Sequence, residues 1–242
     1  MKTIFTYLFI FSLAGCFAQQ NWKTLTKDEY LKKVKPFREK MNKTASFSMR
    51  IHYASYQGHD GTDAYDEQDG YVMKNRDKFH NYALGIHTIQ DGKTRLAFDS
   101  VRKIITVNDI SEFNAIQENF DTVSLNAFIK NIQFVQAGEA QYFRIEYKPG
   151  YRFQSVEMKI QNDWITQTTL NYAGVVKSPV NGKDVKPKVV INYTHIKINP
   201  RLDESLFSLE KYITYNGNKK IFLNNAFKDY KFYDQRVKPF FK

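Results

Sequence analysis

The segment Ser46-Phe47-Ser48-Met49-Arg50-Ile51-His52-Tyr53 decides the fold class of this chain. Its apolar side chains are Phe47, Met49, Ile51 and Tyr53, and its polar side chains alternate with them at Ser48, Arg50 and His52. Side chains of an extended chain point alternately to opposite sides, so this pattern has the period of a β-strand. The segment therefore predicts a strand with one apolar face toward a core and one polar face toward water.

The same alternation returns further along the chain, and turn-forming residues separate its occurrences. The apolar positions are Tyr71 and Met73, Leu96 and Phe98, Ile105 and Val107, and alternate residues within 143–147, 156–160 and 189–198. The turn signals are Asn75-Arg76-Asp77, Asp91-Gly92, Pro149-Gly150, Gln161-Asn162-Asp163 and Asn181-Gly182-Lys183. Because such turns join neighbouring strands, they predict an antiparallel meander. The expected fold class is mainly β (α+β), with a strongly curved antiparallel sheet or half-barrel of roughly nine to eleven strands.

An amphipathic helix is expected before the first strand. Thr26-Lys27-Asp28-Glu29 has the pattern of a capping box, in which the Thr and Glu side chains each bind the other residue's backbone N–H. Apolar residues then recur at helical spacing at Tyr30, Leu31, Val34, Phe37 and Met41. Pro36 is expected to kink or divide this helix. Its apolar side needs a partner surface, which we expect to be the concave face of the sheet.

Shorter helices are expected elsewhere. Residues 111–132 carry apolar side chains at mixed helical spacings, with Asp121 or Ser124 as a cap for a short helix through Asn131. Residues 203–207 predict a single helical turn. In the tail from Lys219, the spacing of Leu223, Phe227 and Tyr230 also suggests a helix. We expect these segments to cover one face of the sheet.

Residues 1–18 have the pattern of a secretory signal peptide, because Lys2 precedes a short apolar run from Ile4 to Leu13. Two kinds of processing fit the end of this segment. Leu13-Ala14-Gly15-Cys16 resembles a bacterial lipobox, which would leave Cys16 lipidated, and Ala18 fits an ordinary cleavage site. Both alternatives predict an exported protein, periplasmic or associated with the outer membrane.

The charge is unevenly distributed. The chain has a formal net charge of +11, but residues 22–43 hold eight basic and three acidic residues, and residues 217–242 hold seven and two. The segment between these ends is balanced. A neutral body in an exported protein argues against nucleic acid as a partner. The basic ends favour contact with a membrane surface or with envelope proteins.

The sequence lacks the patterns of common catalytic sites. Its five histidines are scattered, and H-E-x-x-H, G-x-S-x-G and glycine-rich phosphate-loop motifs do not occur. Cys16 is the single cysteine, so no intramolecular disulfide can form. We therefore expect no enzymatic activity, no catalytic residues, no cofactor and no metal site.

The order of these elements resembles a known family. A signal peptide, a helix ending near Met41, the strand at residues 47–51, and the closing segments VINYTHIKIN (190–199) and LDESLFS (202–208) are similar to LolA-like outer-membrane lipoprotein carriers. The resemblance covers residues 26 to 213. It implies a half-barrel whose concave face, covered by helices, holds acyl chains or other apolar ligands. The expected domains are a signal peptide at 1–18, a LolA-like half-barrel at 22–213 and a basic, aromatic extension at 214–242.

This resemblance suggests that apolar side chains of the sheet and the N-terminal helix line a cavity. The candidate cavity residues are Tyr30, Leu31, Val34, Met49, Ile51, Tyr71, Met73, Phe98, Tyr147 and Met158. The helix would close over them as a lid, and the ligand would be apolar, acylated or a lipid-modified protein. The same residues would equally suit a filled core. The alternative function is a non-enzymatic scaffold or interaction subunit of an envelope assembly, anchored through Cys16 if the lipobox is used.

Overall fold

The computed structural model describes residues 21–110, 127–216 and 220–236 of the 242-residue chain. The expected signal peptide, the expected lipobox at Cys16, and the expected caps Asp121 and Ser124 lie outside the described residues. Among the described residues, no helix is both long enough and apolar enough to cross a membrane.

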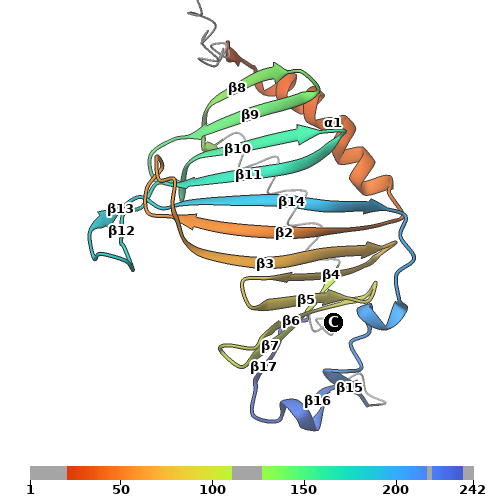
Figure 1. The fold of residues 1–242 in the computed structure, drawn as a ribbon. Helices are drawn as coiled ribbons and strands as arrows, with labels where there is room; N and C mark the ends of the chain where they lie inside the picture. Colours follow the sequence, from red (N-terminus) through yellow and green to blue (C-terminus); the bar gives the residue numbers. More distant parts are fainter. Residues whose placement is uncertain (1–20, 111–126, 217–219, 237–242) are drawn as a thin grey trace, which may run out of the picture.

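The main sheet has thirteen strands and is curved and open (Figure 1). In spatial order these are β1 (Lys23–Thr24), β8 (Ile129–Ala137), β9 (Ala140–Tyr147), β10 (Phe153–Gln161), β11 (Trp164–Tyr172), β14 (Lys188–Ile198), β2 (Ser46–Tyr56), β3 (Ala64–Asn75), β4 (Lys78–Ala83), β5 (Ile86–Gln90), β6 (Thr94–Asp99), β7 (Ile104–Asp109) and β17 (Lys231–Asp234). All neighbours are antiparallel except β7 and β17. The expected mainly-β fold class is confirmed, with more strands than predicted.

After the short edge strand β1 and the helix that follows it, the chain continues at the centre of the sheet with β2. It then proceeds by hairpins through β3 to β7, and from β8 it returns through β9, β10 and β11 to β14. The pairing of β14 with β2 joins the two halves. The predicted turns lie at hairpin connections, for example Asp91-Gly92 between β5 and β6, where Gly92 has φ +99°. Small hairpins of β12 (Val176–Lys177) with β13 (Asp184–Val185), and of β15 (Ile213–Tyr215) with β16 (Ile221–Leu223), lie outside the main sheet.

The N-terminal helix α1 (Lys27–Lys43) begins at the predicted capping box. The Thr26 backbone N–H donates to Glu29 Oε2 at 2.8 Å, and the Glu29 N–H donates to Thr26 Oγ1 at 3.2 Å. The helix is not divided at Pro36, so of the two expected effects of this proline, division does not occur. Pro36 is exposed, so water can bind the carbonyl that its missing N–H would have paired with.

One face of the sheet, here called the helix face, packs against α1. Directly paired residues of neighbouring antiparallel strands share a face, and Phe134, Phe143 and Met158 are paired across β8, β9 and β10. The buried cluster between helix and sheet consists of Leu25, Val34, Phe37, Ile132, Phe143, Ile145 and Ile160. On β2 this face carries the predicted apolar side of the strand, with Phe47, Met49 and Ile51 all buried.

The opposite face, here called the far face, is covered over β5, β6 and β7 by the C-terminal cover, residues 204–216 and 220–230. This cover includes short 3₁₀ helices at Glu204–Phe207 (η1) and Asn225–Phe227 (η2). The buried cluster beneath it consists of Ile89, Leu96, Phe98, Ile105, Val107, Leu209, Tyr212, Ile213 and Ile221. Asn75 Nδ2 donates to Glu204 Oε1 at 2.8 Å, and Lys103 Nζ pairs with Asp229 Oδ2 at 3.0 Å. Polar contacts therefore stabilise the position of the C-terminal cover at both of its ends.

Two predictions of helical segments are wrong. Residues 129–137 form strand β8, so no helix runs through Asn131. Ile129 and Ile132 are three residues apart, which is a helical spacing, but an irregularity between Ile129 and Asn131 lets both pair with β9 on one face of the strand. The tail forms β16, η2 and β17 in place of a helix. Residue 213, where the half-barrel domain was expected to end, is the first residue of β15, and Ile213 and Ile221 lie in the same buried cluster.

Candidate functional site

A half-open groove of about 790 Å³ lies on the far face, over strands β14, β2, β3 and β4. The C-terminal cover occupies the next strands on the same face, so the groove is the part of that face beside it. Its lining consists of Ser48, Met49, Arg50, Ile51, His52, Asp69, Gly70, Tyr71, Met73, Tyr82, Thr194, His195 and Lys197. This volume is within the range of small-molecule binding sites, about 300–1,000 Å³.

The centre of the groove is a row of side chains that crosses the sheet. Thr194, Arg50, Tyr71 and Tyr82 are paired in succession across β14, β2, β3 and β4, and His87 and Phe98 continue the row on β5 and β6. Ring centroids are 5.9 Å apart for Tyr71 and Tyr82 and 4.5 Å apart for Tyr82 and His87. Phe98 then stacks on Tyr230 of the C-terminal cover at 5.3 Å. The row therefore changes from a polar hydroxyl at β14 and a cation at β2 to aromatic rings toward the cover.

Gly70 allows β3 and β4 to approach closely at the groove. A Cβ atom at this position would lie 2.3 Å from the carbonyl oxygen of Tyr82. Such a contact with backbone can be relieved only by moving a strand. Glycine at this position therefore keeps Tyr71 and Tyr82 at their observed spacing.

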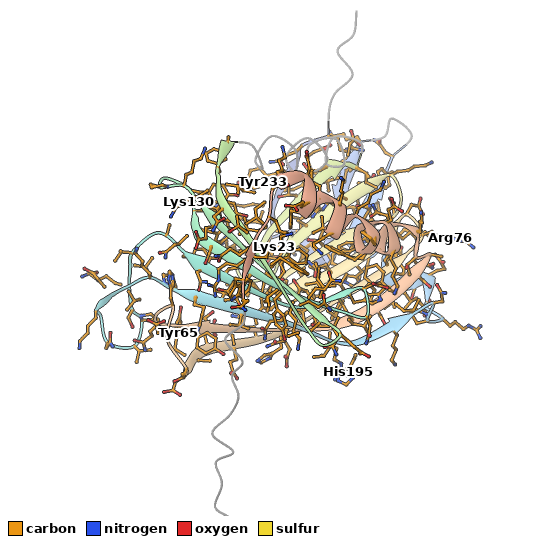
Figure 2. All side chains as sticks on the ribbon, turned by 90° about the horizontal axis from the view of Figure 1, so that it is seen from above. Lys23, Tyr65, Arg76, Lys130, His195 and Tyr233 are labelled. Carbon is orange, nitrogen blue, oxygen red and sulfur yellow. The ribbon has the colours of Figure 1, made fainter. Side chains whose placement is uncertain are left out.

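A β-bulge in β14 shapes the open side of the groove. Thr194 pairs with Arg50 and Lys197 pairs with Ser48, so His195 and Ile196 together oppose the single residue Met49. His195 has φ +50°, a left-handed conformation that is uncommon outside glycine. Figure 2 shows His195 on the side of the sheet away from α1. Thr194, His195 and Lys197 are all exposed.

Charge in the groove is divided between its two ends. At one end the Asp69 carboxylate lies 2.9 Å from His52 Nδ1, with Glu67 3.9 Å from His52 Nε2. At the centre and at the bulge, the side chains of Arg50 and Lys197 form no hydrogen bond or ion pair with any other residue that the structure describes. The basic charges beside the bulge are therefore not neutralised by a neighbouring carboxylate.

Beside the groove, His80 and His87 form a buried polar cluster with Tyr71. The Tyr71 hydroxyl lies 3.1 Å from His80 Nε2, which is 3.4 Å from His87 Nδ1. Burial, and next the neighbouring His87, lower the pKa of His80 to about 4. Burial also raises the pKa of the Tyr71 hydroxyl. At neutral pH this cluster is therefore uncharged and supports the aromatic side of the groove.

The structure divides the candidate cavity residues between the two faces. Tyr71 and Met73 line the groove, and Phe98 lies beneath the C-terminal cover. The side chains on or against the helix face are Tyr30, Val34, Met49, Ile51, Tyr147 and Met158, and Met49 and Ile51 also appear in the groove lining at strand β2. Leu31 lies on α1, is partly exposed and does not belong to the buried cluster. No single cavity brings all of these residues together, because neighbouring positions on a strand point to opposite sides.

Sequence reasoning did not select the polar groove residues. The groove is lined by Arg50, Tyr82, Thr194 and Lys197. Of these, the sequence pattern identified only Arg50, as part of the polar face of a strand. A polar strand face is ordinarily solvated, so the pattern gave no reason to place a site there. Among the described residues, no group of three or more His, Cys, Asp and Glu side chains is arranged to hold a metal ion.

The sequence matches no protein-family model and no curated protein. Among solved structures, the fold is similar to an uncharacterized conserved protein from Thermus thermophilus, with a TM-score of 0.45 and 10% identity, covering 85% of this chain and 99% of that one. It is also similar to a DUF1329 family protein from Desulfovibrio piger, with a TM-score of 0.31 and 9% identity, covering 74% and 98%. Similarity at this level does not assign a function to this chain.

Proposed function

We propose that this protein is an exported, non-enzymatic binding protein that holds an apolar or acylated ligand in the groove of the far face. The observation that carries this proposal is a groove of about 790 Å³ in which aromatic and methionine side chains line a sheet face that the C-terminal cover leaves open. Flexible Met73 and the flat rings of Tyr71 and Tyr82 suit variable acyl chains. The resemblance of the sequence to LolA-like carriers supports the same ligand class.

The ligand site is assigned to the groove and not to the space beneath α1. Val34 and Phe37 of α1 are buried against Phe143, which has no exposed surface. The ring of Tyr30 also contacts Phe143 edge-on, with centroids 5.6 Å apart. A ligand entering there would have to break a packed core, whereas the groove is already open.

We also propose that the protein is exported and is attracted to a membrane surface or to envelope proteins. The apolar run in residues 4–13 supports export, by soluble release or by a lipid on Cys16. The exposed lysines of α1, Lys32, Lys33 and Lys35, support attraction to an anionic membrane surface or to envelope proteins. Such attraction would bring the groove close to a source of acylated ligand.

Replacing Tyr82 by alanine should weaken ligand binding. The probe is cis-parinaric acid, a fluorescent fatty acid, titrated into the natural protein and into Tyr82→Ala. Loss of one aromatic contact predicts an increase in the dissociation constant of about fivefold to tenfold. Tyr65→Ala is the matched control, because Tyr65 lies on β3 beside β2, is 38% exposed and does not line the groove.

The control should bind the probe as tightly as the natural protein. Thermal unfolding followed by circular dichroism would confirm that both variants are folded. Absence of probe binding by the natural protein, or equal binding by the Tyr82→Ala variant, would contradict the proposed function.

A further inference from the structure

We infer that the groove selects an amphiphile with an anionic head group, a carboxylate or a phosphate, which Arg50 and Lys197 bind while the apolar part lies on Tyr71, Met73 and Tyr82. This inference rests on the proposed function and names the ligand class of the same site. Three observations support the inference. They are the register of β14, the pairing of nearby charges, and the separation of charged from aromatic side chains in the groove.

The β-bulge in β14 reverses the alternation of its last residues. Without the extra residue, Ile196 would stand opposite Ser48 and face the groove. With it, Lys197 pairs with Ser48 on the far face, and Ile196 packs against the buried cluster of Phe47, Met49 and Trp164 on the helix face. The left-handed backbone of His195, at φ +50°, accompanies this change. The bulge therefore places a lysine in the groove and an isoleucine in the core.

Several exposed cations of this protein pair with a carboxylate, but the two in the groove do not. Lys40 lies 3.0 Å from Asp163, and Lys177 lies 2.8 Å from Asp184. Arg50 and Lys197 have no such partner among the described residues, and the nearest lining carboxylate, Asp69, lies against His52. Lys197 is opposite Ser48, which shares a face of β2 with Arg50, so the two cations are diagonal neighbours on the far face. Unneutralised cations in such an arrangement attract an anion, and a guanidinium can bind the two oxygens of a carboxylate or phosphate together.

The apolar side of the groove extends from these cations in one direction only. In the central row Arg50 is followed by Tyr71 and Tyr82, which lead toward Phe98 under the C-terminal cover. A free inorganic anion would not contact these rings, and an uncharged lipid would not pair with the cations. An anionic amphiphile complements both parts of the groove at once.

Isothermal titration calorimetry with matched ligands tests this inference. The ligands are dodecanoate, dodecyl phosphate, dodecanol and inorganic phosphate, each titrated into the natural protein and into the double variant Arg50→Gln/Lys197→Gln. In the natural protein both anionic amphiphiles should bind at least about tenfold more tightly than dodecanol. The double variant should lose that preference and bind dodecanol unchanged. The tighter of the two anions identifies the head group.

The matched control is Arg76→Gln/Lys183→Gln, which removes the same charge from exposed positions outside the groove. It should retain the natural preference. Equal binding of dodecanol and dodecanoate by the natural protein, equal losses in the two double variants, or inorganic phosphate binding as tightly as dodecyl phosphate would overturn the inference. In each of these cases a bound amphiphile would leave the proposed function standing, whereas failure of every dodecyl ligand would refute both.

Discussion

Replacing Phe143 by alanine should lower the free energy of unfolding by about 3 to 5 kcal/mol. Phe143 is fully buried on β9, and its ring lies 5.6 Å from that of Tyr30 on α1 and 5.1 Å from that of Phe134 on β8. Its removal would leave a cavity between the helix and the sheet. Equilibrium unfolding in urea, followed by tryptophan fluorescence and circular dichroism, measures the change.

Phe222→Ala is the matched control, because Phe222 lies on β16 and is 45% exposed. This substitution should change the free energy of unfolding by less than about 1 kcal/mol. The pair of variants also bears on function. If α1 were a lid that opens readily for a ligand, truncating Phe143 would cost little, and a loss below about 1 kcal/mol would contradict a packed helix–sheet core.

Stability should fall by about 2 to 3 kcal/mol as the pH is lowered from 7 to below 4, through the buried imidazole of His80. His80 is 7% exposed, and burial followed by the neighbouring His87 lowers its pKa from 6.5 to about 4. Between these two values the unfolded chain binds the proton and the folded protein does not. This contribution is therefore complete above pH 6.5 and is lost as the pH falls toward 4.

Urea unfolding of the natural protein and of His80→Gln at about pH 7, about pH 6 and about pH 5 measures this effect, because each step reports proton uptake by the unfolded state. The variant should show a smaller loss of stability between the first and last conditions. His195→Gln, which removes an exposed imidazole, should retain the natural slope. Identical slopes for the natural protein and His80→Gln would show that His80 does not resist protonation in the folded state.

The period of the sequence predicted the strand class well, because it depends on local geometry alone. On β2, Phe47, Met49 and Ile51 are buried as their alternation indicates, and the capping box at Thr26 starts α1. Segments with few alternating apolar residues were less informative. Ile129 and Ile132 have a helical spacing of three residues, and only their irregular pairing with β9 makes residues 129–137 a strand.

The groove could not be predicted in the same way, because it depends on contacts between distant parts of the chain. Arg50 and Tyr71 share a face only through the register of β2 and β3, and Lys197 joins them only through the bulge at His195. The C-terminal cover reaches the far face from the other end of the sequence, where the basic, aromatic tail beyond the LolA-like resemblance was predicted to be a separate extension. A polar strand face became a candidate site through these tertiary contacts.

The central claim, that the ligand lies on the sheet face opposite α1, can be tested directly by photo-cross-linking. A fatty acid carrying a diazirine on its chain would be bound to the full-length protein, irradiated and mapped by peptide mass spectrometry. We predict adducts on β2, β3 and β4, at or beside Met73, Tyr71 and Tyr82. Adducts concentrated on α1 and on β9 around Phe143 would contradict this claim and return the site to the helix face.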